Sequence, residues 1–287
     1  MVNSTTLAPP PSGVIPHTVA TSRTPAAVLR MLGNETAKNL TILWHRRILV
    51  LVELAMMVVF YLGVQYLIGG GSFVDALLPV TMIGFLVYVV AYLLLVKVVA
   101  GILEEMNTGT LEQMHLSPLP PWLLSVGLTT AVMAEGVLVA GLVGGALAIS
   151  LNVEFPGLSW AALVPAVLTL LDVAGFALLM GGIALTVASI GAINHVIYSM
   201  IGMLNGAYVP VYAYPDWLQV IAKLVPSTLG IDVLRRMLIE DASLAATWAD
   251  HSLQWALLHT AAMLLLGWTV YQWQIRRGLR DGRLGPR

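Results

Sequence analysis

Residues 76–99 read ALLPVTMIGFLVYVVAYLLLVKVV, and Lys97 is the one charged side chain in that run. A helix needs about 20 mainly apolar residues to cross the hydrocarbon core of a bilayer. A helix that is apolar on every side has no face to offer to water, so it belongs in lipid or in a large core. The run therefore predicts a membrane-spanning helix, and the rest of the chain can be interpreted outward from it.

The composition of the whole chain agrees with a membrane environment. Of its 287 residues, 58% are hydrophobic and only 10% are charged, and the mean hydropathy is +0.86. Soluble domains carry about 25% charged residues, so a water-facing surface is excluded. We predict an all-α integral membrane protein with one membrane domain. The formal net charge of −1 gives no sign of a nucleic-acid partner, and the absence of Cys excludes disulfides and thiolate sites.

Similar apolar runs recur along the chain and predict six spans. The expected transmembrane helices cover residues 48–68, 76–99, 122–150, 161–189, 196–212 and 253–273. Turn-forming residues separate the early spans, and a longer stretch of mixed polarity precedes the last. An even number of spans places both ends of the chain on the same side of the membrane.

The distribution of basic residues indicates which side that is. Every Lys and Arg of the chain except Lys223, Arg235 and Arg236 falls before the first span, at the end of the second or after the sixth. Loops rich in Lys and Arg stay in the cytoplasm. We therefore expect a multi-pass protein of the cell membrane with cytoplasmic N- and C-termini.

The two terminal segments differ from the membrane domain, which we place at residues 25–277. Residues 1–24 are rich in Pro, Ser and Thr with no apolar core, which is typical of a disordered tail. Residues 25–45 repeat apolar side chains at helical spacing and predict an N-terminal helix that lies in the membrane interface. Residues 278–287 form a short basic cytoplasmic tail.

The segment between the second and third spans reads EEMNTGTLEQMHLSP over residues 104–118. It is longer and more acidic than a simple turn requires. At helical spacing, Glu105 and Glu112 lie on one face, and the opposite face carries Leu103, Met106, Thr110 and Met114. Two interpretations stay open on this pattern alone. The segment is either a capped cytoplasmic turn or an amphipathic element that docks on a soluble partner.

Part of this segment, E-x3-G-T-L-E-x4-S-P, resembles the cytoplasmic loop of ABC-2 type transport permeases, the membrane subunits of ABC exporters. The residues that carry the resemblance are Glu105, Gly109, Thr110, Leu111, Glu112, Ser117 and Pro118. A second pattern at residues 208–235, Y-V-P-V-x3-P-x-W-L-x7-P-x5-D-x2-R, is similar to the same family. The six-span layout and the interfacial helix agree, so the resemblance covers roughly residues 25–277.

The resemblance implies partners and a mechanism. The loop would be the coupling helix that docks on a separate P-loop ATPase, which would bind ATP and Mg²⁺. This chain contains no G-x-x-x-x-G-K-[ST] motif, so we expect no cofactor in it and no enzymatic activity of its own. A second permease copy or a similar chain would complete the pathway within the membrane lipids. Short outer helices after the fifth span would partly re-enter the membrane.

Two sets of residues are candidates for the transport pathway. Glu135 and Asp172 lie within the third and fourth predicted spans, where a carboxyl group is costly and often functional. The alternative is a neutral, hydrogen-bonded carboxyl. The second set lies around the end of the fifth span, where Pro210 should weaken the helix because it lacks a backbone N–H. These candidates for an outer gate, with ordinary helix packing as the alternative, are Met203, Asn205, Tyr208, Pro210 and Tyr212.

The predicted function is export of a drug or another small amphiphilic molecule, driven by ATP. Export of a lipid or a lipid-linked glycan by the same mechanism is an alternative. A secondary transporter driven by an ion gradient is another, and it would predict charge pairs and inverted repeats within the membrane. The sequence shows neither, since Glu135 and Asp172 have no evident partner and His259 stands alone. An intramembrane enzyme would need a paired catalytic constellation, which is also not evident.

Overall fold

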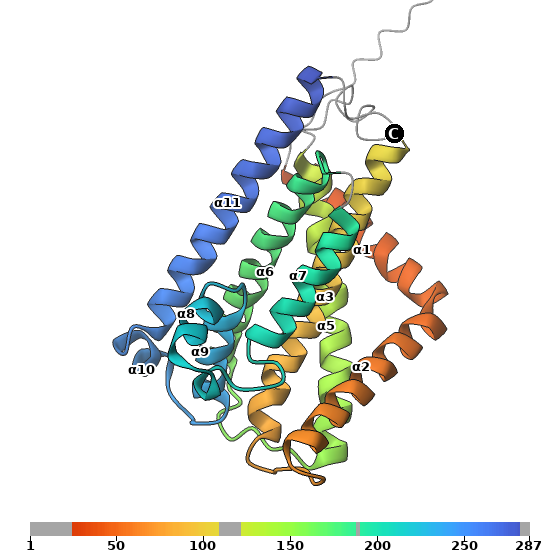
Figure 1. The fold of residues 1–287 in the computed structure, drawn as a ribbon. Coiled ribbons are helices and arrows are strands. Elements are labelled where there is room, and N and C mark those ends of the chain that lie inside the picture. The colour runs from red at the N-terminus through yellow and green to blue at the C-terminus, as the bar shows by residue number, and fades with distance from the viewer. Residues whose placement is uncertain (1–24, 109–121, 188–189, 282–287) are drawn as a thin grey trace, which may run out of the picture.

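The structure is a computed structural model that describes residues 25–108, 122–187 and 190–281 (Figure 1). Within these ranges it is all-helical and contains no strand. The predicted disordered tail, most of the loop motif and the last six residues lie outside the described residues. The helices are α1 (Pro25–His45), α2 (Arg47–Ile68), α3 (Leu78–Asn107), α5 (Trp122–Leu151), α6 (Leu163–Ala184), α7 (Ile190–Leu204), α8 (Asp216–Lys223), α9 (Thr228–Leu238), α10 (Leu244–Ala249) and α11 (Ser252–Asp281), with 3-10 turns η1 (Trp160–Ala162) and η2 (Val211–Ala213).

Five of the described helices are long and apolar enough to cross a membrane. They are α2, α3, α5, α6 with the preceding η1, and α11. Helix α7 is apolar but has only 15 residues. The pair α8 and α9 reaches a sixth span in length and composition, but it is bent by 100°. The chain is therefore a multi-pass helical membrane protein, and the expected six uniform spans reduce to five long helices and shorter pieces.

Of the six predicted spans, two agree with a helix at both ends to within two residues, three agree at one end only, and the fifth agrees at neither. The first and third spans match α2 and α5 to within one residue. The second and sixth were too short, because α3 continues to Asn107 and α11 to Asp281, inside the predicted basic tail. The fourth was too long, because α6 ends at Ala184. Charged residues mark where a helix leaves the lipid, but its backbone hydrogen bonds persist in water, so charge does not end the helix.

The predicted fifth span, residues 196–212, was wrong at both ends. The observed helix α7 runs from Ile190 to Leu204. It stops there because Asn205 Oδ1 accepts the backbone N–H of Ala207 at 3.0 Å, while Gly206 adopts a φ of +88° that suits glycine. Pro210 therefore follows the helix and does not weaken it from within, which corrects the predicted role of this residue.

Helix α3 occupies the centre of the bundle and packs against α5, α6, α7 and α9. Among the described helices, α6 and α11 share the most extensive contact. A Cβ atom added to Gly267 of α11 would lie 2.0 Å from the carbonyl oxygen of Gly175 on α6. The two backbones therefore touch, which is how small residues join helices in lipid. This contact fixes α11 against α6 and brings their polar side chains together.

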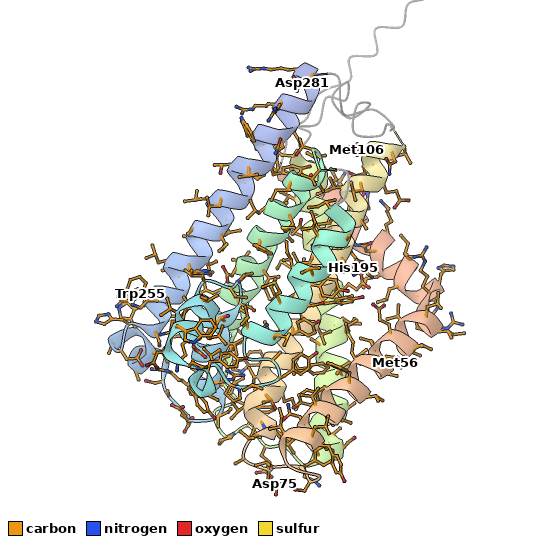
Figure 2. All side chains as sticks on the ribbon, in the orientation of Figure 1. Met56, Asp75, Met106, His195, Trp255 and Asp281 are labelled. Atoms are coloured by element: carbon orange, nitrogen blue, oxygen red, sulfur yellow. The ribbon has the colours of Figure 1, made fainter. Side chains whose placement is uncertain are left out.

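The ends of the bundle can be followed in Figures 1 and 2. Met106 near the end of α3 and Asp281 at the end of α11 lie at one end of the molecule, and Asp75 lies at the other. Helices α8, α9 and α10 gather beside the start of α11, towards the Asp75 end. Helix α2 leans away from the bundle on the side opposite α11. Met106 and Asp281 therefore mark one end of the bundle, and the bent pair lies towards the other end.

Candidate functional site

The loop motif begins on the last turn of α3. Glu105 is part of that helix, and its side chain is only partly exposed. The Oε2 atom of Glu105 is buried and has no hydrogen-bond partner among the described residues. The other residues of the predicted coupling element, namely Gly109, Thr110, Leu111, Glu112, Ser117 and Pro118, lie outside the described residues. The loop motif therefore begins within helix α3, and no turn separates its first residues from that helix.

Glu135 is one of two buried carboxylates in the bundle. It lies on α5 with a side chain only 1% exposed, and it accepts a hydrogen bond from Nζ of Lys97 on α3. Lys97 is 37% exposed, since its long stem can carry the ammonium group towards more polar surroundings. The expectation that Glu135 is isolated was wrong. The pairing was foreseeable, because α3 and α5 run antiparallel and the two residues lie at similar distances from the loop that joins these helices.

Asp172 is the second buried carboxylate, near the middle of α6. Its Oδ1 atom lies 2.9 Å from Nδ1 of His259 on α11, and its Oδ2 atom accepts the backbone N–H of Ser227 at 2.7 Å. His259 Nε2 lies 3.4 Å from the carbonyl oxygen of Leu224. Both oxygens of Asp172 are therefore satisfied. The sequence had left Asp172 and His259 unpaired, and that expectation was also wrong.

Asn205 extends this polar network to the end of α7. It is fully buried, and its Nδ2 atom donates to Oγ of Ser227 at 3.2 Å. Ser227 sits in the bend between α8 and α9 with a φ of +78°, a left-handed conformation that is uncommon for serine. Contacts from Asp172 and Asn205 hold this residue in place. The network therefore joins α6, α7 and α11 to the bend of the outer helix pair.

Arg235 provides a second buried anchor for the outer segment. From α9, its Nε atom donates to the carbonyl oxygen of Val80 at 2.8 Å, and one terminal nitrogen donates to that of Gly206 at 2.6 Å. Asp232 lies 3.8 Å away, one turn earlier on the same helix. The guanidinium therefore ties α9 to α3 and to the turn after α7. The sequence had noted Asp232 and Arg235 only as part of a family pattern, although their spacing places both on one helix face.

The structure separates the residues predicted to form an outer gate. Asn205 and Pro210 are buried, and the ring of Tyr208 packs edge-on against Phe60 of α2 and Tyr88 of α3 at centroid distances of 5.6 and 5.9 Å. Met203 and Tyr212 are 68% and 70% exposed. Tyr208 therefore contacts the bundle, whereas Met203 and Tyr212 face away from it.

The side chains outside the spans carry their own polar contacts. Hydrogen bonds from Ser252 and the neighbouring Arg236 lower the pKa of the Asp250 carboxyl below its ordinary value. Burial raises the pKa of the Tyr214 hydroxyl, which donates to the carbonyl oxygen of Met203. Both residues stay in their usual charge states at neutral pH. Asp250 and Arg236 form an exposed ion pair between α10 and α9.

Comparison of the sequence with models of protein families found a match. The model described as "ABC-2 type transporter" matches residues 35–239, which is well over half of the chain. The chain belongs to the ABC-2 type transporter family. A search of curated proteins found no match. The family consists of membrane subunits of ABC transporters, so this ABC-2 protein is a membrane permease and is not itself the catalytic subunit.

The family match covers only part of the polar network of this ABC-2 permease. It includes Glu135, Asp172, Asn205 and Arg235, and it ends before α10 and α11. His259, the partner of Asp172, is therefore supplied from outside it. The Lys97–Glu135 ion pair, and the Asp172–His259 pair when His259 is protonated, are a feature that the ion-gradient alternative had predicted. Membership of an ABC transporter family does not support that alternative.

Proposed function

We propose that this ABC-2 permease is the membrane subunit of an ATP-driven exporter. Two copies, or this chain with a similar one, enclose the pathway, and a separate P-loop ATPase binds ATP and Mg²⁺. The family match over residues 35–239 is the observation that carries the proposal. The cargo is a drug or another small amphiphilic molecule. The cytoplasmic side is the end that holds Met106 and Asp281, which agrees with the excess of Lys and Arg near the termini.

The loop at residues 104–118 couples the permease to the ATPase. Its first residues, Glu104–Asn107, continue α3 as an unbroken helix. Because α3 packs against four other helices of the bundle, a push on the loop would move a helix that most of the bundle contacts. A close-packed interior transmits such a displacement with little loss. The coupling role of the residues beyond 108 rests on the sequence motif.

The surfaces of α2 and α7 suit an apolar or amphiphilic cargo. Helix α2 buries only a few of its residues and leaves most of its apolar surface exposed, and α7 presents Val196, Met200 and Met203 outward. Met side chains adapt to ligands of different shape. Tyr208 lies where α2, α3 and the end of α7 meet. We infer that these two helices face the pathway and that Tyr208 belongs to its outer closure.

Transport by reconstituted protein tests this function. The full chain would be reconstituted with a candidate P-loop ATPase subunit, and ATP-dependent dye efflux would be measured in proteoliposomes. We expect Gly109→Pro and Glu112→Arg each to slow efflux at least tenfold while membrane insertion stays normal. Asp75→Arg, a matched charge reversal at the opposite end, should leave efflux unchanged. Unimpaired efflux with both loop substitutions present would reject the loop as the coupling element.

A further inference from the structure

A groove opens between the start of α11 and the bent pair α8 and α9. It has a volume of about 620 Å³, within the range typical of small-molecule sites. Charged side chains line one part of it, and Trp255, Leu258 and Ala262 of α11 line another. Trp255 marks the place in Figure 2, near the start of the long C-terminal helix. The groove is therefore amphiphilic and lies where α11 enters the membrane.

The groove contains basic residues, which are scarce at this end of the molecule. Only three basic residues fall on the predicted outer side, and Arg235 is buried in its own contacts. The other two, Lys223 and Arg236, both line the groove. Two carboxylates, Asp232 and Asp250, lie with them, so the groove is formally neutral.

Both Lys223 and Arg236 can bind an additional group. Lys223 is exposed and has no hydrogen bond or ion pair among the described residues. Arg236 donates to Asp250 through one terminal nitrogen, and a guanidinium has five N–H donors, so it can also bind a phosphate. A zwitterionic group would satisfy both signs of charge in this groove better than an anion would.

An apolar stripe leads from the groove along α11. Leu258, Ala262 and Leu265 follow one another at helical spacing on its outer face, and the two leucines are 59% and 66% exposed. Seven residues of helix span about 10 Å. Leu265 then lines a second cavity of about 400 Å³ beside Trp268, between α5, α6 and α11.

The surface of the second cavity is almost entirely apolar. Its two hydroxyl residues are Thr129 and Thr130 of α5, and each donates to a carbonyl oxygen of its own helix, at 2.7 and 2.9 Å. The remaining lining is apolar. Such a cavity suits a hydrocarbon chain, which within lipid is held by close packing against apolar side chains.

We propose that this face of α11 binds one zwitterionic phospholipid with an ammonium head group, as a resident lipid. The phosphate contacts Lys223 and Arg236, and the ammonium group lies near Asp232 and Asp250. One acyl chain follows the stripe into the cavity beside Trp268. The order of the surface, charged and then apolar along one helix, matches the order of head and chain in a lipid. Assignment to the outer leaflet rests on the proposed orientation of the permease.

Lipid retention measured by native mass spectrometry tests the proposal without any ATPase. The full chain would be released from bilayers that contain equal amounts of phosphatidylethanolamine and phosphatidylglycerol. We expect one phosphatidylethanolamine per chain on the parent protein. Lys223→Glu should reduce its retention at least tenfold by repelling the phosphate. Ala262→Trp should do the same by blocking the stripe at an exposed position that the fold does not use.

The control is Arg280→Glu, an exposed charge reversal at the far end of the same helix, which should retain the lipid. Equal phosphatidylethanolamine retention by the parent and both groove variants would overturn the proposal. A preference for phosphatidylglycerol would overturn the zwitterionic assignment. ATP-dependent translocation of labelled phosphatidylethanolamine that Lys223→Glu abolishes would identify the lipid as cargo and not as a resident. These results are separate from dye efflux, so the export function can stand or fall independently.

Discussion

The two buried carboxylates of the bundle are held in different ways. Glu135 has a single partner, Lys97, which is itself partly exposed and belongs to the neighbouring helix in the chain. Asp172 has a partner on each oxygen, one from α11 and one from the backbone of the outer bend. We call the Lys97–Glu135 contact the inner pair. The outer network comprises the contacts among Asp172, His259, Ser227 and Asn205, together with the separate anchor that Arg235 makes to the carbonyl oxygens of Val80 and Gly206.

The difference shows what each arrangement can do. The inner pair connects two helices that are consecutive in the chain and already lie side by side. It therefore contributes little to determining how the helices are arranged. The outer network joins segments that are far apart in the chain, and it holds the bent helix pair against the bundle. Losing one member of the network leaves other buried polar groups unpaired. We therefore expect substitutions in the outer network to cost more than substitutions in the inner pair.

The largest effect is expected for Arg235→Met. It removes the guanidinium group that donates to the carbonyl oxygens of Val80 and Gly206, and both oxygens stay buried without that hydrogen bond. We expect the free energy of unfolding to fall by about 3 kcal/mol. Thermal unfolding in detergent would measure it. Arg236→Met, on the next residue of the same helix, removes an exposed ion pair worth about 0.5 kcal/mol. Equal losses for the two variants would contradict a special role for Arg235.

Asp172→Ala should follow in size. It leaves the backbone N–H of Ser227 and the ring of His259 without their acceptor, at a cost of about 2 kcal/mol. Asp172→Asn keeps one acceptor oxygen and should lose about half as much. Unfolding in detergent measures both, with Asp75→Ala at an exposed turn as the control. If Asp172→Ala unfolds like the parent protein, the outer network does not hold the bend.

The aromatic contact beside the network distinguishes packing residues from exposed ones. Tyr208→Ala loses ring contacts with Phe60 and Tyr88, which contribute about 2 kcal/mol. Tyr212→Ala removes an exposed ring and should leave stability unchanged. In proteoliposomes, we expect passive dye leak to rise for Tyr208→Ala and to stay at the parent level for Tyr212→Ala. Leak from the Tyr212 variant alone would reverse this assignment of the gate.

The smallest effect is expected for the inner pair. Glu135→Gln keeps the shape of the side chain and leaves Lys97 free to extend towards polar surroundings. Hydrogen bonds between membrane helices contribute about 0.6 kcal/mol on average, so the free energy of unfolding should fall by no more than about 1 kcal/mol. The double variant Lys97→Met with Glu135→Gln should be close to the single one. A loss larger than that of Asp172→Ala would invert the comparison between the two regions.

The sequence predicted the helices better than their ends. Both ends of α2 and both ends of α5 agreed because apolar runs of bilayer length have few alternatives. The end of α7 was missed because the side chain of Asn205 and the positive φ of Gly206 stop it, and Pro210 drew attention to a later position. Most residues of the coupling motif lie outside the described ranges, so the prediction of a coupling helix stays a prediction.

The sequence by itself determined the class of this protein, the approximate position of its long helices and, through two motifs, its family. Lipid imposes those features locally, since each span must bury its own backbone in a continuous apolar helix. Only the tertiary structure decided the partners of its buried charges. Asp172 meets Ser227 and His259 across 55 and 87 residues of chain. Such contacts depend on how the helices rotate and pack against one another. The sequence of one helix does not indicate which residues of another helix its side chains will face.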